Sequence, residues 1–308
     1  MSSHASPAGA APTLPPRAVW PGLLLATLGA IAFSGKAIIV KLAYRHGVDA
    51  VTLITYRMLF ALPMFLLLAW WAGRGKPPLT RRDKLAVLGL GFSGYYLASF
   101  LDFAGLAYIS ASLERLILYL NPTIVLLLAL IVFKRKVTQR QLIALAVSYC
   151  GVLLVFGHEV TLVGSHVALG AALVFGSAVS YAVYLVYSGE EVKRLGALRL
   201  TGLATTVACV LCIVQFLVLR PVSVALAQPS PVFWLSLLNA VLCTFAPVLM
   251  VMMAIERIGA SLTAQTGMIG PLATILLGVL ILGEPFTAWV AAGTVGVLAG
   301  IWLLARAR

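Results

Sequence analysis

Long apolar runs follow one another along almost the whole chain, and they restrict it to one class of fold. A helix needs about 20 apolar residues to cross the roughly 30 Å hydrocarbon core of a bilayer. Apolar residues make up 62% of the chain and charged residues 10%, which leaves too few polar groups to cover a soluble fold. The sequence therefore predicts an all-α integral membrane protein with ten transmembrane helices. The expected spans are 19–40, 51–72, 85–108, 111–133, 141–157, 167–188, 200–219, 231–255, 258–283 and 286–305.

The two halves of the chain repeat each other. At an offset of 148 residues, Gly22 matches Gly170 and Ala30 matches Ala178, so the first span has a counterpart in the sixth. This counterpart argues against removal of the first span as a signal peptide. Each half then holds five helices, and an odd number inverts the second half relative to the first. A longer set of identical residues, at an offset of 149 and without a gap, is Ile109/Ile258, Ala111/Ala260, Ser112/Ser261, Leu113/Leu262, Pro122/Pro271, Thr138/Thr287 and Gly151/Gly300.

Basic residues give an independent estimate of the topology, because Lys and Arg prefer cytoplasmic loops. With the N-terminus inside, 16 of the 22 Lys and Arg residues fall on the cytoplasmic side, and both termini are expected there. The basic residues 134–136 align with 283–285, which contain Glu284, as expected if these loops face opposite compartments. We expect residues 1–18 to form a disordered cytoplasmic tail, 19–157 the first repeat and 166–308 the second.

Several other functional classes are disfavoured. The net charge of +13 is spread over short clusters that flank apolar runs, unlike the basic stripe of a nucleic-acid-binding surface. All four cysteines fall inside apolar runs, and the histidines fall in predicted loops and the tail, so we expect no metal, cofactor or disulfide. Gly89, Gly91 and Gly94 form a GxGxxG pattern, but they lie inside a predicted span without a preceding strand. An intramembrane enzyme is retained only as a minor alternative.

The second half carries a recognisable motif, in residues 258–262, Gly270-Pro271 and 282–285 (Leu-Gly-Glu-Pro). With these residues the chain resembles the drug/metabolite transporter superfamily, specifically its EamA-type exporters built from two five-helix units. The first half matches at Arg57 and departs at Arg135, where the family usually has an acid. The resemblance implies alternating access through a central cavity and export of small metabolites across a bacterial inner membrane. It is similar in particular to the aromatic amino-acid exporters, and a drug or nucleotide-sugar-like metabolite carrier is the alternative.

Polar side chains within the spans are the candidates for the transport site, because they are costly in hydrocarbon unless they face protein or water. In the sixth span, hydroxyl and aromatic groups recur at helical spacing, which suits the stacking of a planar ligand. Helix packing is the competing interpretation. Lys36 either meets a substrate carboxylate or extends towards the membrane surface. The predicted substrate-binding residues are Lys36, Tyr95, Tyr119, Ser177, Tyr181, Tyr184, Gln265 and Met268.

The charged residues within the spans lie only in the first half. Arg57 is expected to pair with Asp102 or a backbone carbonyl, and Glu114 with Arg115 is interpreted as a pair at a helix terminus. Asp102 and Glu114 are also the remaining candidates for proton coupling, with facilitated diffusion left open. Two prolines at equivalent positions, Pro122 and Pro271, are predicted hinges because proline bends a membrane helix. The internal duplication favours a monomer.

Overall fold

The structure is a computed structural model that describes residues 16–133, 138–164, 166–267 and 269–306. Within these residues the regular structure is helical and contains no strands. Eight helices are long and apolar enough to cross a membrane, and the segments Gly270–Leu282 and Ala288–Leu304 are shorter apolar helices. The described part of the chain is therefore a multi-pass membrane protein. The predicted tail lies almost entirely outside the described residues.

Most helices of the first half begin with a side-chain cap, supplied by the residue just before the helix. Asp49, Thr80, Ser110 and Thr138 each accept a hydrogen bond from a first-turn amide, which satisfies donors that have no partner within the helix. The third span is formed by three consecutive elements, of which the middle one is a π-helix. The elements are α1 (Pro16–Tyr44), α2 (Ala50–Gly73), α3 (Arg81–Leu90), η1 (Gly91–Leu97), α4 (Ala98–Leu106), α5 (Ala111–Leu118), α6 (Asn121–Phe133) and α7 (Gln139–Val163).

The second half repeats this layout and its irregularities. The π-helix η2 lies at the position of η1 shifted by the repeat offset, and the break before α13 corresponds to the break between α5 and α6. Such coincident irregularities are expected if both halves derive from one five-helix unit. The elements are α8 (His166–Leu195), α9 (Ala197–Leu219), α10 (Val222–Leu226), α11 (Ser230–Ala240), η2 (Val241–Phe245), α12 (Ala246–Gly267), α13 (Gly270–Leu277), η3 (Gly278–Leu282) and α14 (Ala288–Arg306).

The boundary between the eighth and ninth spans differs from the prediction. A loop is expected between residues 255 and 258, but α12 continues through this region to Gly267. The chain nevertheless reverses relative to α1, because Gly22 lies against Ile258 whereas Ser34 lies against Gly270. No proline interrupts residues 255–267, so helical hydrogen bonds persist where a loop was expected.

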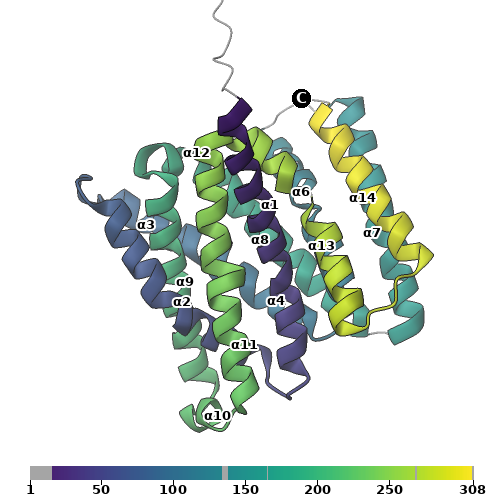
Figure 1. The fold of residues 1–308 in the computed structure, drawn as a ribbon, viewed down its shortest axis with the longest axis horizontal. Helices are drawn as coiled ribbons and strands as arrows, with labels where there is room; N and C mark the ends of the chain where they lie inside the picture. Colours follow the sequence, from purple (N-terminus) through teal and green to yellow (C-terminus); the bar gives the residue numbers. More distant parts are fainter. Residues whose placement is uncertain (1–15, 134–137, 165, 268, 307–308) are drawn as a thin grey trace, which may run out of the picture.

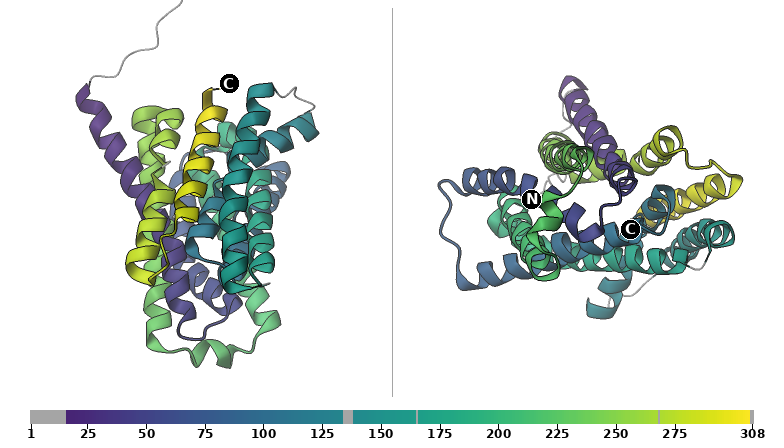
Figure 2. Two further views of the ribbon diagram at one scale, coloured as in Figure 1. Left: turned by 90° about the vertical axis from the view of Figure 1, so that its right-hand side faces the viewer. Right: turned by 90° about the horizontal axis from the view of Figure 1, so that it is seen from below.

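The long helices of one half pack against helices of the other half (Figures 1 and 2). The most extensive pairs are α7 with α14, α1 with α12, α2 with α9, and α4 with α8. In the repeat, α1 corresponds to α8, and the third span, which ends with α4, corresponds to the eighth, which contains α12. The α1–α12 and α4–α8 pairs are therefore equivalent contacts. The other two pairs, α2 with α9 and α7 with α14, each join two corresponding helices. Contacts that recur between corresponding elements are those expected of two repeats related by a pseudo-twofold axis.

Aromatic residues mark the two ends of the bundle. The start of α1 and the end of α14 lie at one end, here called the terminal end (Figure 2). All six tryptophans are exposed, as expected for rings at membrane interfaces. Trp20, Trp70, Trp71 and Trp302 lie near the helix termini at the terminal end, and Trp234 and Trp289 lie near the starts of α11 and α14 at the opposite end.

Candidate transport site

A buried cluster of charges lies where α1, α4 and α5 meet. Lys36 on α1 places its Nζ 2.5 Å from Asp102 Oδ2 and 3.5 Å from Glu114 Oε1. The carboxylates are almost inaccessible, with exposed fractions of 2% for the Asp102 side chain and 0% for Glu114, whereas Lys36 retains 17%. Two acids from different helices therefore converge on one ammonium group. We call Lys36, Asp102 and Glu114 the ion cluster.

Two arginines border the ion cluster. Arg115 lies with its Nε 3.9 Å from Glu114 Oε2 and donates from Nη2 to the Phe33 carbonyl at 3.1 Å. Arg57 donates from Nε to Thr244 Oγ1 at 3.0 Å, and its guanidinium lies 5.1 Å from the ring centre of Phe103. Arg57 was expected to pair with Asp102 or a backbone carbonyl. In the structure its Nε donates to the Thr244 hydroxyl, and Lys36 is the cation that lies beside Asp102.

Several polar atoms of this region retain unused bonding capacity. Among the described residues, Asp102 Oδ1, both Glu114 oxygens and Arg57 Nη1 are buried without a hydrogen-bond partner. Buried polar groups are normally hydrogen-bonded, so this concentration is unusual. With Lys36 and Arg115, the region presents both acceptors and donors that can bind a small ligand carrying both charges.

Tyr119 lies one turn beyond Arg115, at the interface between the repeats. Its hydroxyl donates to the Gly267 carbonyl at 2.8 Å, and Ser34 on α1 donates to the Gly270 carbonyl at 2.8 Å. The first bond joins α5 to the end of α12, and the second joins α1 to the start of α13. The backbone of Gln265 lies in α12, and Met268 lies outside the described residues.

The predicted hinge prolines follow the helix breaks. Pro122 is the second residue of α6, after the turn at Tyr119 and Leu120, and Pro271 is the second residue of α13. The prolines therefore lie in the first turn of a helix, where a missing N–H costs little. The interpretation as kinks inside continuous helices is wrong, since the chain is already broken before each proline.

The tyrosines predicted on the sixth span form a second, separate cluster. The hydroxyls of Tyr95 and Tyr184 lie 3.2 Å apart, and Tyr181 stacks on Tyr184 with ring centres 5.5 Å apart. Leu90 and Leu200 pack against them. Ser177 donates to the Ala98 carbonyl at 2.7 Å, so its hydroxyl joins α8 to α4. The predicted residues thus divide between a tyrosine cluster on η1 and α8 and the region of Lys36 and Tyr119.

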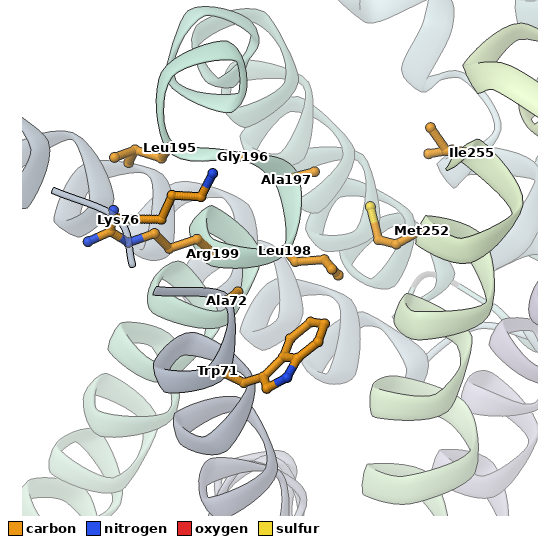
Figure 3. A pocket seen from close by; sticks show the side chains of 10 residues that line it. All are labelled: Trp71, Ala72, Lys76, Leu195, Gly196, Ala197, Leu198, Arg199, Met252 and Ile255. Atoms are coloured by element: carbon orange, nitrogen blue, oxygen red, sulfur yellow. The ribbon is translucent and has the colours of Figure 1, made fainter. Parts of the chain in front are cut away.

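Two pockets open at the ends of the bundle. The pocket at the terminal end has a volume of about 400 Å³ and lies between the α2–α9 pair and α12 (Figure 3). The residues that line it include Trp71, Lys76, Arg199 and Met252. The one at the opposite end has a volume of about 510 Å³ and is lined by polar residues that the sequence did not single out as a site. They include Lys41, Arg45, Glu159 and Glu284.

Sequence reasoning also missed groups that support the ion cluster. Asn239 donates from Nδ2 to the Lys36 carbonyl at 3.3 Å, and Thr244 donates to the Asn239 carbonyl at 2.9 Å while accepting from Arg57. The cost of an unpaired charge in a span signals that Lys36 needs an acidic partner. That signal could have identified Asp102 and Glu114 as its partners.

Known proteins are similar along most of this chain. The uncharacterized transporter YcbK of Bacillus subtilis (strain 168) is 29% identical over 270 residues, which cover 85% of this chain and 86% of YcbK. The uncharacterized transporter YyaM of the same organism is 28% identical and covers 79% of this chain and 80% of its own. The WAT1-related protein At1g68170 of Arabidopsis thaliana is 28% identical over 54% of this chain and 55% of its own.

A solved crystal structure has the same fold, with a TM-score of 0.62 over 92% of this chain and 95% of its own chain. At 15% sequence identity this similarity concerns the fold alone. The sequence model of one family matches both halves, at residues 20–157 and 168–306. The resemblance drawn from the sequence motifs is thereby confirmed: the chain belongs to the EamA-like transporter family, within the drug/metabolite transporter superfamily.

Proposed function

We propose that this transporter exports amino acids, aromatic or otherwise apolar, and related small metabolites across a bacterial inner membrane. Transport proceeds by alternating access between the inverted repeats, in a single copy of the chain. The terminal end faces the cytoplasm, and the opposite end faces outwards. Basic residues support this orientation, because most of them flank helices at the terminal end.

The ion cluster is the observation that carries the substrate class. The carboxylate of an amino acid suits Lys36 and Arg115, and its ammonium group suits Asp102 and Glu114. A buried ion pair is costly to break unless another pair replaces it. A zwitterion supplies both replacement charges at once, whereas a ligand with one charge leaves a buried group unpaired.

The apolar part of the substrate has a suitable environment beside these charges. Phe103 follows Asp102 directly on α4, and Phe33 lies on α1 with its carbonyl bound by Arg115. The tyrosine cluster on η1 and α8 lies further towards the terminal end. Aromatic side chains favour planar apolar ligands by stacking. This arrangement supports aromatic and apolar amino acids over strongly polar ones.

The proposal is tested by counterflow in proteoliposomes loaded with unlabelled phenylalanine or leucine. We expect uptake of the same labelled amino acid, and we expect N-acetylphenylalanine and phenylalanine amide, which each lack one charge, to drive no exchange. The Lys36→Met variant measures nonspecific leakage. The Arg257→Gln variant, on α12, measures the general effect of removing a cation. Absence of exchange for every zwitterion, or equal exchange with the two derivatives, contradicts the proposed substrate class.

A further inference from the structure

The carboxylate of Glu284 joins the two repeats at the opposite end of the bundle. Its Oε1 accepts a hydrogen bond from the Ala111 amide at 2.7 Å. Its Oε2 accepts from the amide and the hydroxyl of Ser112, at 3.2 and 2.7 Å. Ala111 and Ser112 begin α5 in the first repeat, whereas Glu284 follows η3 in the second. We call these three hydrogen bonds the interrepeat cap.

The interrepeat cap completes the N-terminus of α5. The first amides of a helix have no acceptor within it, and their positive end attracts a negative charge. The local cap residue Ser110 accepts only from the Leu113 amide, at 3.0 Å. Glu284 supplies the acceptors for Ala111 and Ser112. The start of α5 is thus fully capped only while the two repeats lie together at this end.

The backbone around Glu284 is shaped to hold its carboxylate there. Gly283 ends η3 with a φ of 73°, a conformation that favours glycine, and the Glu284 amide donates to the Gly278 carbonyl at 3.1 Å. A Cβ atom at Gly278 would lie 2.9 Å from Glu284 Oε2. The Leu-Gly-Glu-Pro motif therefore combines a tight turn with an acid that binds the other repeat.

Other contacts at this end are of two kinds: some join the two repeats, and others lie within the first repeat. Arg45, in the turn after α1, donates to the Leu282 carbonyl at 2.8 Å, which also joins the repeats. Glu159 instead binds the amide and hydroxyl of Ser110 within the first repeat. Lys41 lies five residues beyond Lys36 on α1, about 7.5 Å along the helix. These contacts therefore lie close to the ion cluster on its outward side.

The terminal end has no equivalent of this cap in its sequence. At the repeat offset, Ala111 and Ser112 correspond to Ala260 and Ser261, and Glu284 corresponds to Arg135. A guanidinium has no acceptor for an amide N–H, and residues 260 and 261 lie inside α12 rather than at a helix N-terminus. The repeats are therefore chemically asymmetric at the one motif where the first half departs from the family pattern.

We propose that Glu284 is the positioning residue that holds the transporter closed on its outward side. Separation of the repeats at this end breaks the interrepeat cap and exposes the ion cluster to the outside. The equivalent position of the inward side has Arg135 in place of an acid, so the closed-outward state is favoured in the absence of substrate. This inference rests on the alternating access of the proposed function, but its test needs no transported substrate.

The test measures access to a probe beneath the cap. Ile109, which lines the pocket at this end, is 2% exposed. In Ile109→Cys protein in right-side-out vesicles, a membrane-impermeant maleimide reports outward opening, after subtraction of labelling in the parent with native cysteines. Adding Glu284→Gln should raise the labelling rate about tenfold, the order expected from losing hydrogen bonds to a charged group.

Glu159→Gln is the matched control, since it removes a carboxylate at the same end without cutting a bond between repeats. We expect it to leave the labelling rate near that of the parent. Ser112→Ala, which loses one bond of the cap from the other repeat, should raise the rate less than Glu284→Gln. Thermal unfolding of each variant separates opening from loss of the fold. An unchanged rate for Glu284→Gln, or an equal rise for Glu159→Gln, overturns the assignment, whatever the outcome of the counterflow assay.

Discussion

At the scale of single residues, Glu114 and Asp102 show how charge is held inside the bundle. An isolated carboxylate at this depth is strongly unfavourable, so its stability depends on the cation beside it. Lys36 contacts both acids at 2.5 and 3.5 Å, whereas Arg115 approaches only Glu114, at 3.9 Å. Lys36 is therefore the residue whose loss leaves the most charge uncompensated.

Replacing Lys36 by methionine tests this dependence. We expect Lys36→Met to destabilise the protein by about 3–5 kcal/mol, the range for breaking a buried pair from one side. Lys36→Arg keeps the charge and should recover part of this loss. The control Lys193→Met removes an exposed cation near the end of α8 and should be nearly neutral. Thermal unfolding in detergent measures all three, and wild-type stability in Lys36→Met would contradict the role of this pair.

At the scale of helices, small residues set how closely the repeats pack. A Cβ atom at Gly151 on α7 would lie 2.7 Å from the Gly293 carbonyl on α14, and one at Gly300 would lie 2.7 Å from the Ala144 carbonyl. Close approach of this kind is typical of membrane helix pairs. Gly151 and Gly300 are equivalent in the repeat, and the structure explains both by the same contact between α7 and α14.

Two glycines on α7 offer a direct comparison. Gly151→Ala forces the α7–α14 pair apart and should cost about 1–3 kcal/mol, as overpacking does. Gly157→Ala lies on the same helix with no atom within 4 Å of the added Cβ, and it should be neutral or stabilising by up to about 1 kcal/mol through helix propensity. Thermal unfolding of the two variants checks this, and equal effects would show that the contact does not limit packing.

The prolines after the helix breaks belong to the same scale. With alanine at both Pro122 and Pro271, the first turns of α6 and α13 gain amide donors, and α5 with α6 can join into a continuous helix. We expect the double variant Pro122→Ala/Pro271→Ala to slow counterflow while keeping its fold. Pro63→Ala, within α2, is the control for loss of a proline elsewhere. Unchanged counterflow and unchanged inward and outward accessibility would end the hinge hypothesis.

At the scale of the whole molecule, the sequence predicted what depends on local pattern. Apolar length predicted the eight segments that are long enough to cross a membrane, and the aligned Pro122/Pro271 and Gly151/Gly300 pairs predicted the repeat. The cost of an unpaired charge could have indicated Asp102 and Glu114 as partners of Lys36. The contact geometry was not predictable, because span order does not say that α1 packs against both α4 and α5. The π-helices and the continuation of α12 beyond residue 255 were also missed, because apolar length alone does not distinguish a π-helix from an α-helix or mark where one helix ends.

The inverted arrangement makes a prediction about the molecule as a whole. The end of α6 and the end of η3 are equivalent in the repeat, yet inversion requires that the residues following them face opposite compartments. Single cysteines at Lys136 and Pro285 avoid the interrepeat cap and test this directly. We expect an impermeant maleimide applied from outside to label Pro285→Cys in intact cells and Lys136→Cys only after permeabilisation, each measured against the parent protein. Labelling of both cysteines from one side would be incompatible with two inverted repeats.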